Sequence, residues 1–359
     1  MEKAKLALDD GTIIEGKAFG YETTATGEIV FSTGMCGYVE SLTDPSFKGQ
    51  ILMSTYPLCG NYGVSEDWYQ SSKIQAEGYV VRELCEKPSK YAANKTLDEF
   101  LKEFKIPAIS GIDTRGLTIK IRKRGTMKCA ITTEELDDSE IVSLAKNQLD
   151  ISDMDLVPQV STKNIKTFGE NMNKRIAIID CGVKKNIINS FLNRNIGVVL
   201  FPYNSSSNDI LDYDINGFMV SCGPGNPQKL SSTVETTRKL HEKFPILGIC
   251  MGQQILAQSF GASTYKMKFG HRGVNQPVKD LVSGKVFISS QNHGFSVDEE
   301  SLIDANFKLS QINLNDKTPE GFIHNELPIQ SVQYHPEAGP GPNDTNFVFN
   351  QFVEQVINY

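Results

Sequence analysis

The hydrophobic pattern changes character near the middle of the chain. Before residue 150, short apolar runs separated by turn residues predict more strand than helix. After residue 174, apolar runs alternate with amphipathic stretches, which is typical of a largely parallel sheet with helices on both faces. The residues between are polar, as expected of a linker or long connection. We therefore predict two domains, residues 1–155 and 156–359, the core of the second beginning at 174.

The first domain is predicted to be a small, β-rich α+β unit. Asp10-Gly11 supplies the positive φ of a tight turn, so residues 3–17 should form a hairpin. Thr96 and Glu99 have the spacing of a capping box, which should open a short helix ending near Phe104. Further strands are expected at 28–32, 50–55 and 79–84, and a second helix at 114–124.

The second domain is predicted to be a doubly wound α/β unit. Strands are expected at 175–180, 197–201, 217–221 and 245–249, and helices at 184–194 and 232–244. Strand-like pieces at 285–289 and 328–334 and a helix at 346–357 complete the pattern. Folds of this class bind ligands at the carboxyl ends of their parallel strands, so we expect the site there.

One cysteine lies at such a strand end. A short apolar run, 246–249, leads into Cys250, and helical spacing follows until Gly261 ends the helix. Gly248 and Gly252 flank the thiol in the order G-x-C-x-G, the cysteine counterpart of a nucleophile elbow. The partial positive charge of a helix N-terminus favours a thiolate. The alternative is a buried structural cysteine, since free cysteine is among the most buried residue types.

A cysteine nucleophile also needs a base and oxyanion donors. His335 follows a predicted strand, and Glu337 stands two residues on, so these two could serve as base and orienting carboxylate. His293 is the second candidate for the base, or a structural histidine. Gly223 and Gly225 could bring backbone N–H groups close to a ligand. Read separately, His-Pro-Glu and Gly-Pro-Gly could each be an ordinary turn.

Composition excludes several classes of function. The 359 residues, 39% hydrophobic and 22% charged, are those of an ordinary globular protein, and a net charge of −7 without a basic run argues against nucleic acid. No apolar stretch reaches membrane length and the amino terminus lacks a signal-peptide core, so we expect a cytoplasmic protein with no membrane partner. Seven cysteines without a C-x-x-C pair argue against a zinc site or a disulfide framework. No P-loop occurs, so any ATP chemistry belongs to another chain.

Taken together, three blocks resemble the signatures of class I (triad) glutamine amidotransferases. They are Gly223-Pro224-Gly225, Gly248-Ile249-Cys250-Met251-Gly252-Gln253-Gln254 and His335-Pro336-Glu337.

Within that class, the chain resembles the small, glutamine-hydrolysing subunits of carbamoyl-phosphate synthetase over nearly its whole length. The amino-terminal blocks that carry this likeness are 33–40, 42–46, 60–63 and 111–115, and two later ones are 180–186 and 266–273. Other amidotransferases of the class lack the amino-terminal domain.

The resemblance implies a role for each matching residue. Cys250 is expected to be the nucleophile, His335 the general base and acid, and Glu337 its orienting carboxylate. L-glutamine is expected to be bound by Ser46, Gly223, Gly225, Met251, Gln254, Asn292, Gly294 and Phe295. Of these, Gly223 and Met251 would act through N–H groups that bind the oxyanion. Ser46 comes from the first domain, which implies a pocket at the domain interface. Gln253 departs from the histidine that many relatives have directly after the elbow glycine. This departure puts no member of the triad in doubt and bears on local packing.

The resemblance also implies the reaction. Glutamine is hydrolysed to glutamate and ammonia through a glutamyl thioester, and the ammonia passes through a tunnel to a large subunit. That subunit is expected to hold ATP, magnesium and bicarbonate and to make carbamoyl phosphate for arginine and pyrimidine biosynthesis. No metal or cofactor is expected in this chain, which should form a heterodimer or a higher oligomer with the large subunit. The alternatives are a glutaminase for another synthase, a cysteine protease and a non-catalytic assembly subunit.

Overall fold

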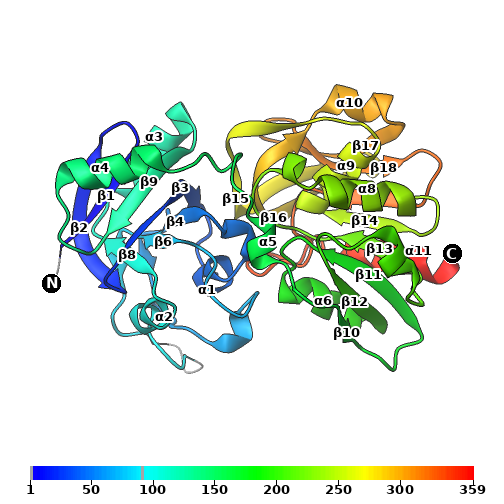
Figure 1. The fold of residues 1–359 in the computed structure, drawn as a ribbon, viewed down its shortest axis with the longest axis horizontal. Coiled ribbons are helices and arrows are strands. Elements are labelled where there is room, and N and C mark those ends of the chain that lie inside the picture. The colour runs from blue at the N-terminus through cyan, green and yellow to red at the C-terminus, as the bar shows by residue number, and fades with distance from the viewer. Residues whose placement is uncertain (1–2, 90–92) are drawn as a thin grey trace. The chain divides into compact units, whose positions relative to one another are not determined.

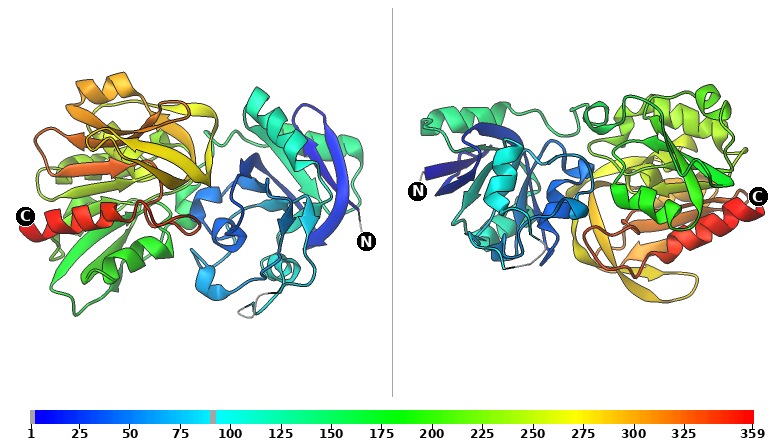
Figure 2. Two further views of the ribbon diagram at one scale, coloured as in Figure 1. Left: turned by 180° about the vertical axis from the view of Figure 1, so that it is seen from behind. Right: turned by 90° about the horizontal axis from the view of Figure 1, so that it is seen from below.

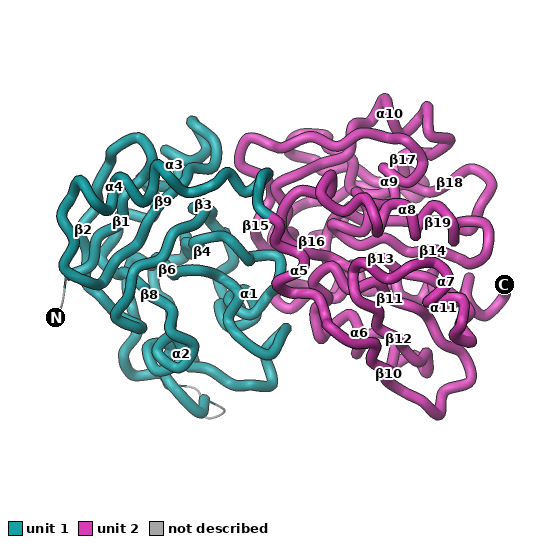
Figure 3. The backbone as a smooth tube through the Cα atoms, viewed as in Figure 1, with its two compact units in different colours: residues 1–154 teal, residues 155–359 magenta. Residues whose placement is uncertain are grey.

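The computed structural model describes residues 3–89 and 93–359, and the chain forms two compact units. Residues 1–154 make up the first and residues 155–359 the second (Figure 3). Each unit is described by itself below. None of the described helices combines the length and apolar character needed to span a bilayer.

The first unit is built on a closed barrel of seven strands in the order β1-β2-β8-β6-β4-β3-β9. Its elements in chain order are β1 (Lys3–Leu8), β2 (Ile13–Gly20), β3 (Thr24–Ser32), α1 (Tyr38–Leu42), the 3-10 turn η1 (Pro45–Phe47), β4 (Gln50–Ser54), β5 (Leu58–Cys59), η2 (Glu66–Trp68), β6 (Gly78–Val80), β7 (Glu83–Leu84), α2 (Leu97–Glu103), β8 (Pro107–Ser110), α3 (Thr114–Arg124), β9 (Met127–Thr132) and α4 (Asp138–Asn147).

Local sequence signals in this unit are confirmed. Strands β1 and β2 pair as a hairpin whose turn contains Gly11 at φ 86°, and the Thr12 N–H donates to the Asp10 carboxylate. The Thr96 hydroxyl accepts from the Glu99 N–H and the Glu99 carboxylate accepts from the Thr96 N–H, which is the predicted capping box of α2. The strand expected at 79–84 is divided into β6 in the barrel and β7, which pairs with β5.

The second unit is built on a ten-stranded sheet in the order β10-β12-β11-β13-β14-β19-β18-β17-β15-β16. Its elements are α5 (Val157–Val160), β10 (Lys166–Phe168), β11 (Lys174–Asp180), α6 (Lys185–Leu192), β12 (Ile196–Pro202), α7 (Ser207–Leu211), β13 (Gly217–Val220), η3 (Pro227–Lys229), α8 (Ser231–Leu240), β14 (Ile246–Ile249), α9 (Met251–Ser259), β15 (Thr264–Asp280), β16 (Val286–Val297), α10 (Glu299–Asp304), β17 (Phe307–Asn313), β18 (Pro319–His324), β19 (Ile329–Val332) and α11 (Phe347–Asn358).

This sheet has a parallel part and an antiparallel part. Strands β12, β11, β13, β14 and β19 run parallel, as the alternating pattern predicts. From β19 onward, β18, β17, β15 and β16 pair antiparallel. The expected linker also contains structure, because β10 pairs antiparallel with β12 at the sheet edge. An edge strand has a polar, solvated side, so its composition resembles that of a connection.

Helices cover both faces of the sheet (Figures 1 and 2). On one face α7, α8, α9 and α10 bury Ile210, Leu240, Ile255 and Leu302 in one core. On the other, α6 and α11 bury residues such as Phe191 and Phe352 in a second core. This layering leaves the carboxyl ends of the parallel strands at one edge, and the predicted site lies there.

Candidate active site

The turn between β14 and α9 has the geometry of a nucleophile elbow. Cys250 has φ 54° and ψ −106°, a strained conformation for a residue with a Cβ. A Cβ on Gly252 would lie 1.9 Å from the Val220 carbonyl oxygen, and one on Gly248 would lie 2.7 Å from the Gly252 oxygen. Both flanking positions therefore require glycine, and the strained turn holds the thiol at the end of the strand.

Two contacts fix Cys250. Its N–H donates to the Val332 carbonyl at 2.9 Å, which ties the elbow to the last residue of β19. Its thiol lies 3.6 Å from the Asn292 carbonyl oxygen on β16. The cysteine thus contacts the strand that leads to His335 and the strand that carries three of the expected glutamine-binding residues.

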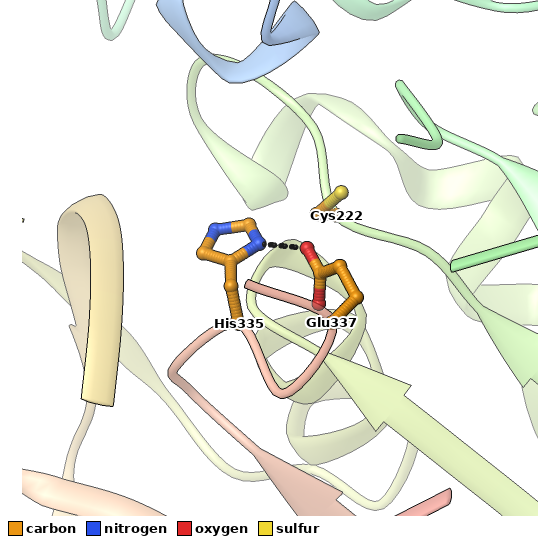
Figure 4. Close-up of side chains that lie close together, drawn as sticks. All are labelled: Cys222, His335 and Glu337. Atoms are coloured by element: carbon orange, nitrogen blue, oxygen red, sulfur yellow. Dashed lines mark hydrogen bonds and ion pairs between the residues drawn. The ribbon is translucent and has the colours of Figure 1, made fainter. Parts of the chain in front are cut away.

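His335 is oriented by Glu337. The His335 N–H donates to the Ser290 carbonyl at 2.8 Å, and the ring Nδ1 lies 2.6 Å from Glu337 Oε1 (Figure 4). His335 Nε2 is buried, and no residue that the structure describes is its hydrogen-bond partner. With its Nδ1–H held by the carboxylate, the imidazole has Nε2 available to exchange a proton.

A buried lysine without a predicted role completes this group. Lys184 at the start of α6 places Nζ 3.0 Å from Glu337 Oε1 and also donates to the Ala338 carbonyl. The Lys184 side chain is 1% exposed and that of Glu337 is 0% exposed. Neither periodicity nor motif spacing marks such a lysine. Its signals in the sequence are its position just after the carboxyl end of a buried strand and its place in the family-like block 180–186.

Electrostatics hold the pair in its charged form. Burial by itself raises the pKa of Glu337, but the charges of Lys184 and His335 lower it to about 2. Burial by itself lowers the pKa of His335, but the Glu337 carboxylate outweighs it and holds the pKa well above its usual value. His335 can therefore carry a proton in this buried position, ready to release it to a leaving group.

Cys222 lies beside this pair (Figure 4). Its thiol donates to the Gly182 carbonyl at 3.3 Å. Cys222, His335 and Glu337 offer ligand atoms within 4.8 Å of one another, so by residue type they could hold a metal. The Lys184 ammonium at 3.0 Å from the same carboxylate supplies the counter-charge that a cation would otherwise provide. The residues present therefore do not favour a metal at this position.

The two residues expected to supply oxyanion N–H groups lie at the start of α9 and in the loop after β13. Met251 is the first residue of α9, and Gly223 follows β13. A Cβ on Gly223 would lie 2.2 Å from the Cys181 carbonyl oxygen, and Gly225 has φ 86°, so this loop needs both glycines. Val220, at the end of β13, is the residue whose carbonyl Gly252 approaches most closely.

The other expected glutamine-binding residues of this unit lie on α9 and β16. Gln254 donates through Nε2 to the Phe295 carbonyl and to Gln333 Oε1, each at 3.0 Å. Asn292, Gly294 and Phe295 lie on β16. The structure thus places them around the elbow, while Gln254 also joins β16 to the segment before His335.

Ser46 belongs to the first unit. It lies in η1, and its N–H donates to the Asp44 carboxylate at 2.9 Å. Its participation in a pocket shared by the two units stays a prediction.

Two further expectations concern neighbours of the site. Both ring nitrogens of His293 face oxygens, Nδ1 the Phe295 carbonyl at 2.8 Å and Nε2 Gln291 Oε1 at 3.2 Å. Burial lowers the pKa of His293 well below its usual value, so this ring stays neutral and the geometry favours His335 as the base. Gln253 is fully buried between the Pro319 carbonyl and the Ser331 hydroxyl, which is a packing role.

Comparison with known proteins identifies similar chains. The family model "Carbamoyl-phosphate synthase small chain, CPSase domain" matches residues 6–131, and "Glutamine amidotransferase class-I" matches residues 177–355. The carbamoyl phosphate synthase small chain of Archaeoglobus fulgidus is 50% identical over 357 residues, covering 99% of each chain. That of Methanocaldococcus jannaschii is 53% identical, covering 98% of each. A crystal structure of a glutamine amidotransferase from Thermotoga maritima aligns with 46% of this chain and 76% of its own, at 20% identity and a TM-score of 0.37.

Proposed function

Because this chain belongs to the family of carbamoyl-phosphate synthase small chains, enzyme subunits with a class I glutamine amidotransferase domain, we propose that Cys250, His335 and Glu337 form its glutaminase triad. The observation that carries this proposal is the orientation of His335 near the strained elbow that presents Cys250. Glu337 holds its Nδ1, and its Nε2 has no hydrogen-bond partner among the described residues. The family also implies glutamine as substrate and a large-subunit partner.

The first half of the reaction forms a thioester. The Cys250 thiolate attacks the side-chain carboxamide carbon of glutamine, and the carbonyl oxygen becomes an oxyanion. The N–H groups of Met251 and Gly223 donate to that oxygen, which lowers the barrier because backbone donors are already in place. His335 Nε2 then gives its proton to the departing nitrogen, so that ammonia leaves and a γ-glutamyl thioester remains.

The second half releases glutamate. His335, now neutral at Nε2, takes a proton from water, and the hydroxide attacks the thioester carbon. That proton restores the imidazolium, which the Glu337 carboxylate stabilises while Lys184 holds Glu337. Collapse of the second tetrahedral intermediate expels the Cys250 thiolate, and the side-chain carboxylic acid of the product gives its proton to water as glutamate leaves. The ammonia is proposed to pass through an internal tunnel to the large subunit, which combines it with bicarbonate and ATP. Its carbamoyl phosphate would serve arginine and pyrimidine biosynthesis.

Two of the alternatives leave a feature of this chain without a purpose. A glutaminase for another synthase has no use for the amino-terminal domain matched at residues 6–131. A non-catalytic assembly subunit does not require a free Nε2 beside a strained cysteine. Neither alternative has a specific observation in its favour.

Substitution of the nucleophile tests the proposal. In the chain reconstituted with its large subunit, Cys250→Ser should reduce glutamine-dependent carbamoyl phosphate synthesis by roughly 10³-fold or more, because serine's far higher pKa makes it a poor nucleophile in this site. Synthesis from free ammonium should stay near the wild-type rate, since the fold and the partner are unchanged. Cys36→Ser, at an exposed cysteine of the first unit, is the control and should retain glutamine-dependent synthesis.

The two substrates separate the possible failures. Retained glutamine-dependent synthesis in Cys250→Ser would exclude Cys250 as the nucleophile. Loss of both activities would mean that this chain takes part in the synthetase chemistry itself.

A further inference from the structure

A buried cluster of charged and polar groups lies behind the glutamine-binding strand. His271 on β15 places Nε2 2.8 Å from Asp316 Oδ2, and its Nδ1 faces Glu320 Oε1 on β18 at 3.5 Å. Asn313 on β17 donates to Glu320 Oε1 at 3.1 Å and lies 3.4 Å from His271 Nδ1. His271, Glu320 and Asn313 are 6%, 0% and 0% exposed, whereas the Asp316 side chain, at the edge of the cluster, is 40% exposed. The imidazole thus joins β15 to β17, β18 and the turn between them.

The part of β16 next to this cluster, residues 291–293, has only a short stretch of regular backbone pairing with β15. In the β15–β16 pairing, residues 271–273 oppose residues 291–293, and register shifts interrupt the ladder on both sides of this block. Three opposed residues between two irregularities are held less firmly by the backbone than a continuous ladder is. Side-chain anchors therefore add to the backbone contacts, such as that between the Ser290 carbonyl and the His335 N–H, that hold this segment.

The cluster around His271 contacts the proposed glutamine site through two sets of residues. His271 opposes His293 in register, their rings meet edge to face at 5.0 Å, and His293 holds the Phe295 carbonyl. On the other side, the Glu320 carbonyl accepts from the Gln333 N–H at 2.9 Å, two residues before His335. The same cluster thus borders the strand that carries Asn292 and the strand that leads to the base.

We propose that His271 is a positioning residue for glutamine binding, which acts by bridging Asp316 and Glu320 and so holding the segment from Asn292 to Phe295 in place. This rests on the proposed glutaminase function of the same site. The effect belongs to substrate binding, because His271 touches neither the thiol nor His335. We therefore expect it in KM rather than in kcat.

The charge state of His271 adds a pH dependence. Burial by itself lowers the pKa of His271, but the hydrogen bonds and charges of Asp316 and Glu320 raise it to about 9. Other charged or titratable groups near the cluster include the neutral His293 and the Arg272 guanidinium on β15, which disfavours a proton on His293. They also include the buried Tyr334 phenol, whose pKa burial and the Glu320 charge raise well above its usual value. Because folding raises the pKa of His271, protonated His271 contributes its full stabilising effect below pH 6.5, the unfolded value. That effect is lost as the pH rises through about 9 and the ring loses its proton.

The test uses two substitutions in the chain reconstituted with its large subunit. His271→Gln removes the cation and should raise the KM for glutamine about tenfold at pH 7.5, on the scale of a small misplacement of binding groups, with kcat within about twofold. Asp316→Asn keeps the acceptor for the Thr318 N–H and hydroxyl but removes the charge that favours protonated His271. Its KM should start to rise about one pH unit lower than that of the wild type.

The controls separate positioning from loss of stability. His241→Gln is the matched control, since His241 lies at the end of α8 beside Glu242, and its glutamine KM should be unchanged. The amino group of glutamine titrates in the same way with every variant. Only a difference in the pH dependence of KM between variants is therefore evidence about His271. Melting temperature is measured for each variant. A purely structural role would lower it without moving the KM profile.

Three outcomes overturn the inference while leaving the proposed function intact. The first is an identical KM profile in wild type and Asp316→Asn, which also decides the matter if His271→Gln does not fold. The second is a fall in kcat at unchanged KM. The third is a metal that co-purifies and is lost in His271→Gln, because His271, His293 and Glu320 also lie close enough to share an ion. Absence of glutamine hydrolysis by the wild-type complex would instead overturn the proposed function.

Discussion

At the scale of single residues, the proposed site depends on buried charges that compensate one another. Lys184, Glu337 and His335 have side chains at most 1% exposed and lie in one hydrogen-bonded group. Removing one member of a buried pair leaves an uncompensated charge, which costs far more than breaking a surface pair. Lys239 and Glu235 form such a surface pair in the same unit, with side chains 58% and 63% exposed.

The contrast between these two pairs predicts their effects on stability. Lys184→Met should lower the free energy of unfolding by about 3–5 kcal/mol, and adding Glu337→Gln should recover part of that loss. Lys239→Met should cost no more than about 0.5 kcal/mol. Urea unfolding followed by circular dichroism measures all three. Because the pKa of Glu337 is lowered from 4.5 to about 2, the deficit of Lys184→Met should shrink as pH falls between these values. Equal costs for Lys184→Met and Lys239→Met would contradict the assigned ion pair.

A second prediction at this scale concerns which thiol reacts. A diazo-ketone analogue of glutamine should label Cys250, because the reagent must first occupy the proposed glutamine site. Iodoacetamide, which has no such recognition, should label Cys36, the exposed cysteine. Excess glutamine should protect Cys250 and leave Cys36 unaffected, and peptide mass spectrometry measures both. Even labelling of several cysteines by the analogue would argue against the assignment.

At the scale of elements, the activity of the elbow depends on how closely the start of α9 approaches the end of β13. Gly252→Ala places a methyl group where the Val220 carbonyl oxygen lies at 1.9 Å from the ideal Cβ, so the start of α9 must shift. A shift of that size at the nucleophile should reduce glutamine hydrolysis on the order of 10²-fold. Gly284→Ala is the control, since Gly284 also has a positive φ, but a Cβ there would meet no atom of the described residues within 4 Å. Its glutamine hydrolysis should stay near that of wild type, and similar losses in both variants would argue against a local effect at the elbow.

At the scale of the whole molecule, Ser46 tests whether the first unit contributes to glutamine binding. Ser46→Ala removes one neutral hydrogen bond, worth about 0.5–1.5 kcal/mol, so the KM for glutamine should rise roughly two- to tenfold with a smaller change in kcat. Ser89→Ala, in the same unit and with an exposed hydroxyl bonded to the Asn61 carbonyl, should leave KM unchanged. Steady-state kinetics with the large subunit present measure both. Unaltered glutamine kinetics in Ser46→Ala would exclude Ser46 from the site.

The sequence by itself determined the features that depend on local chemistry. The Asp10-Gly11 hairpin, the capping box at Thr96 and the elbow around Cys250 each need particular residues at fixed short spacing, so the pattern alone predicts them. The parallel strands were also predictable, because strands buried on both faces read as continuous apolar runs.

Only the tertiary structure decided the rest. Strand β15 could not be predicted, because its burial is irregular and its pairing is interrupted by register shifts, which disrupts the period of two. The role of Lys184 depends on the fold bringing it against Glu337, which is far away in the chain. The cluster around His271 likewise assembles from three strands and a turn. Buried charges are selected by their partners, and partners distant in sequence leave no local pattern from which they could be predicted.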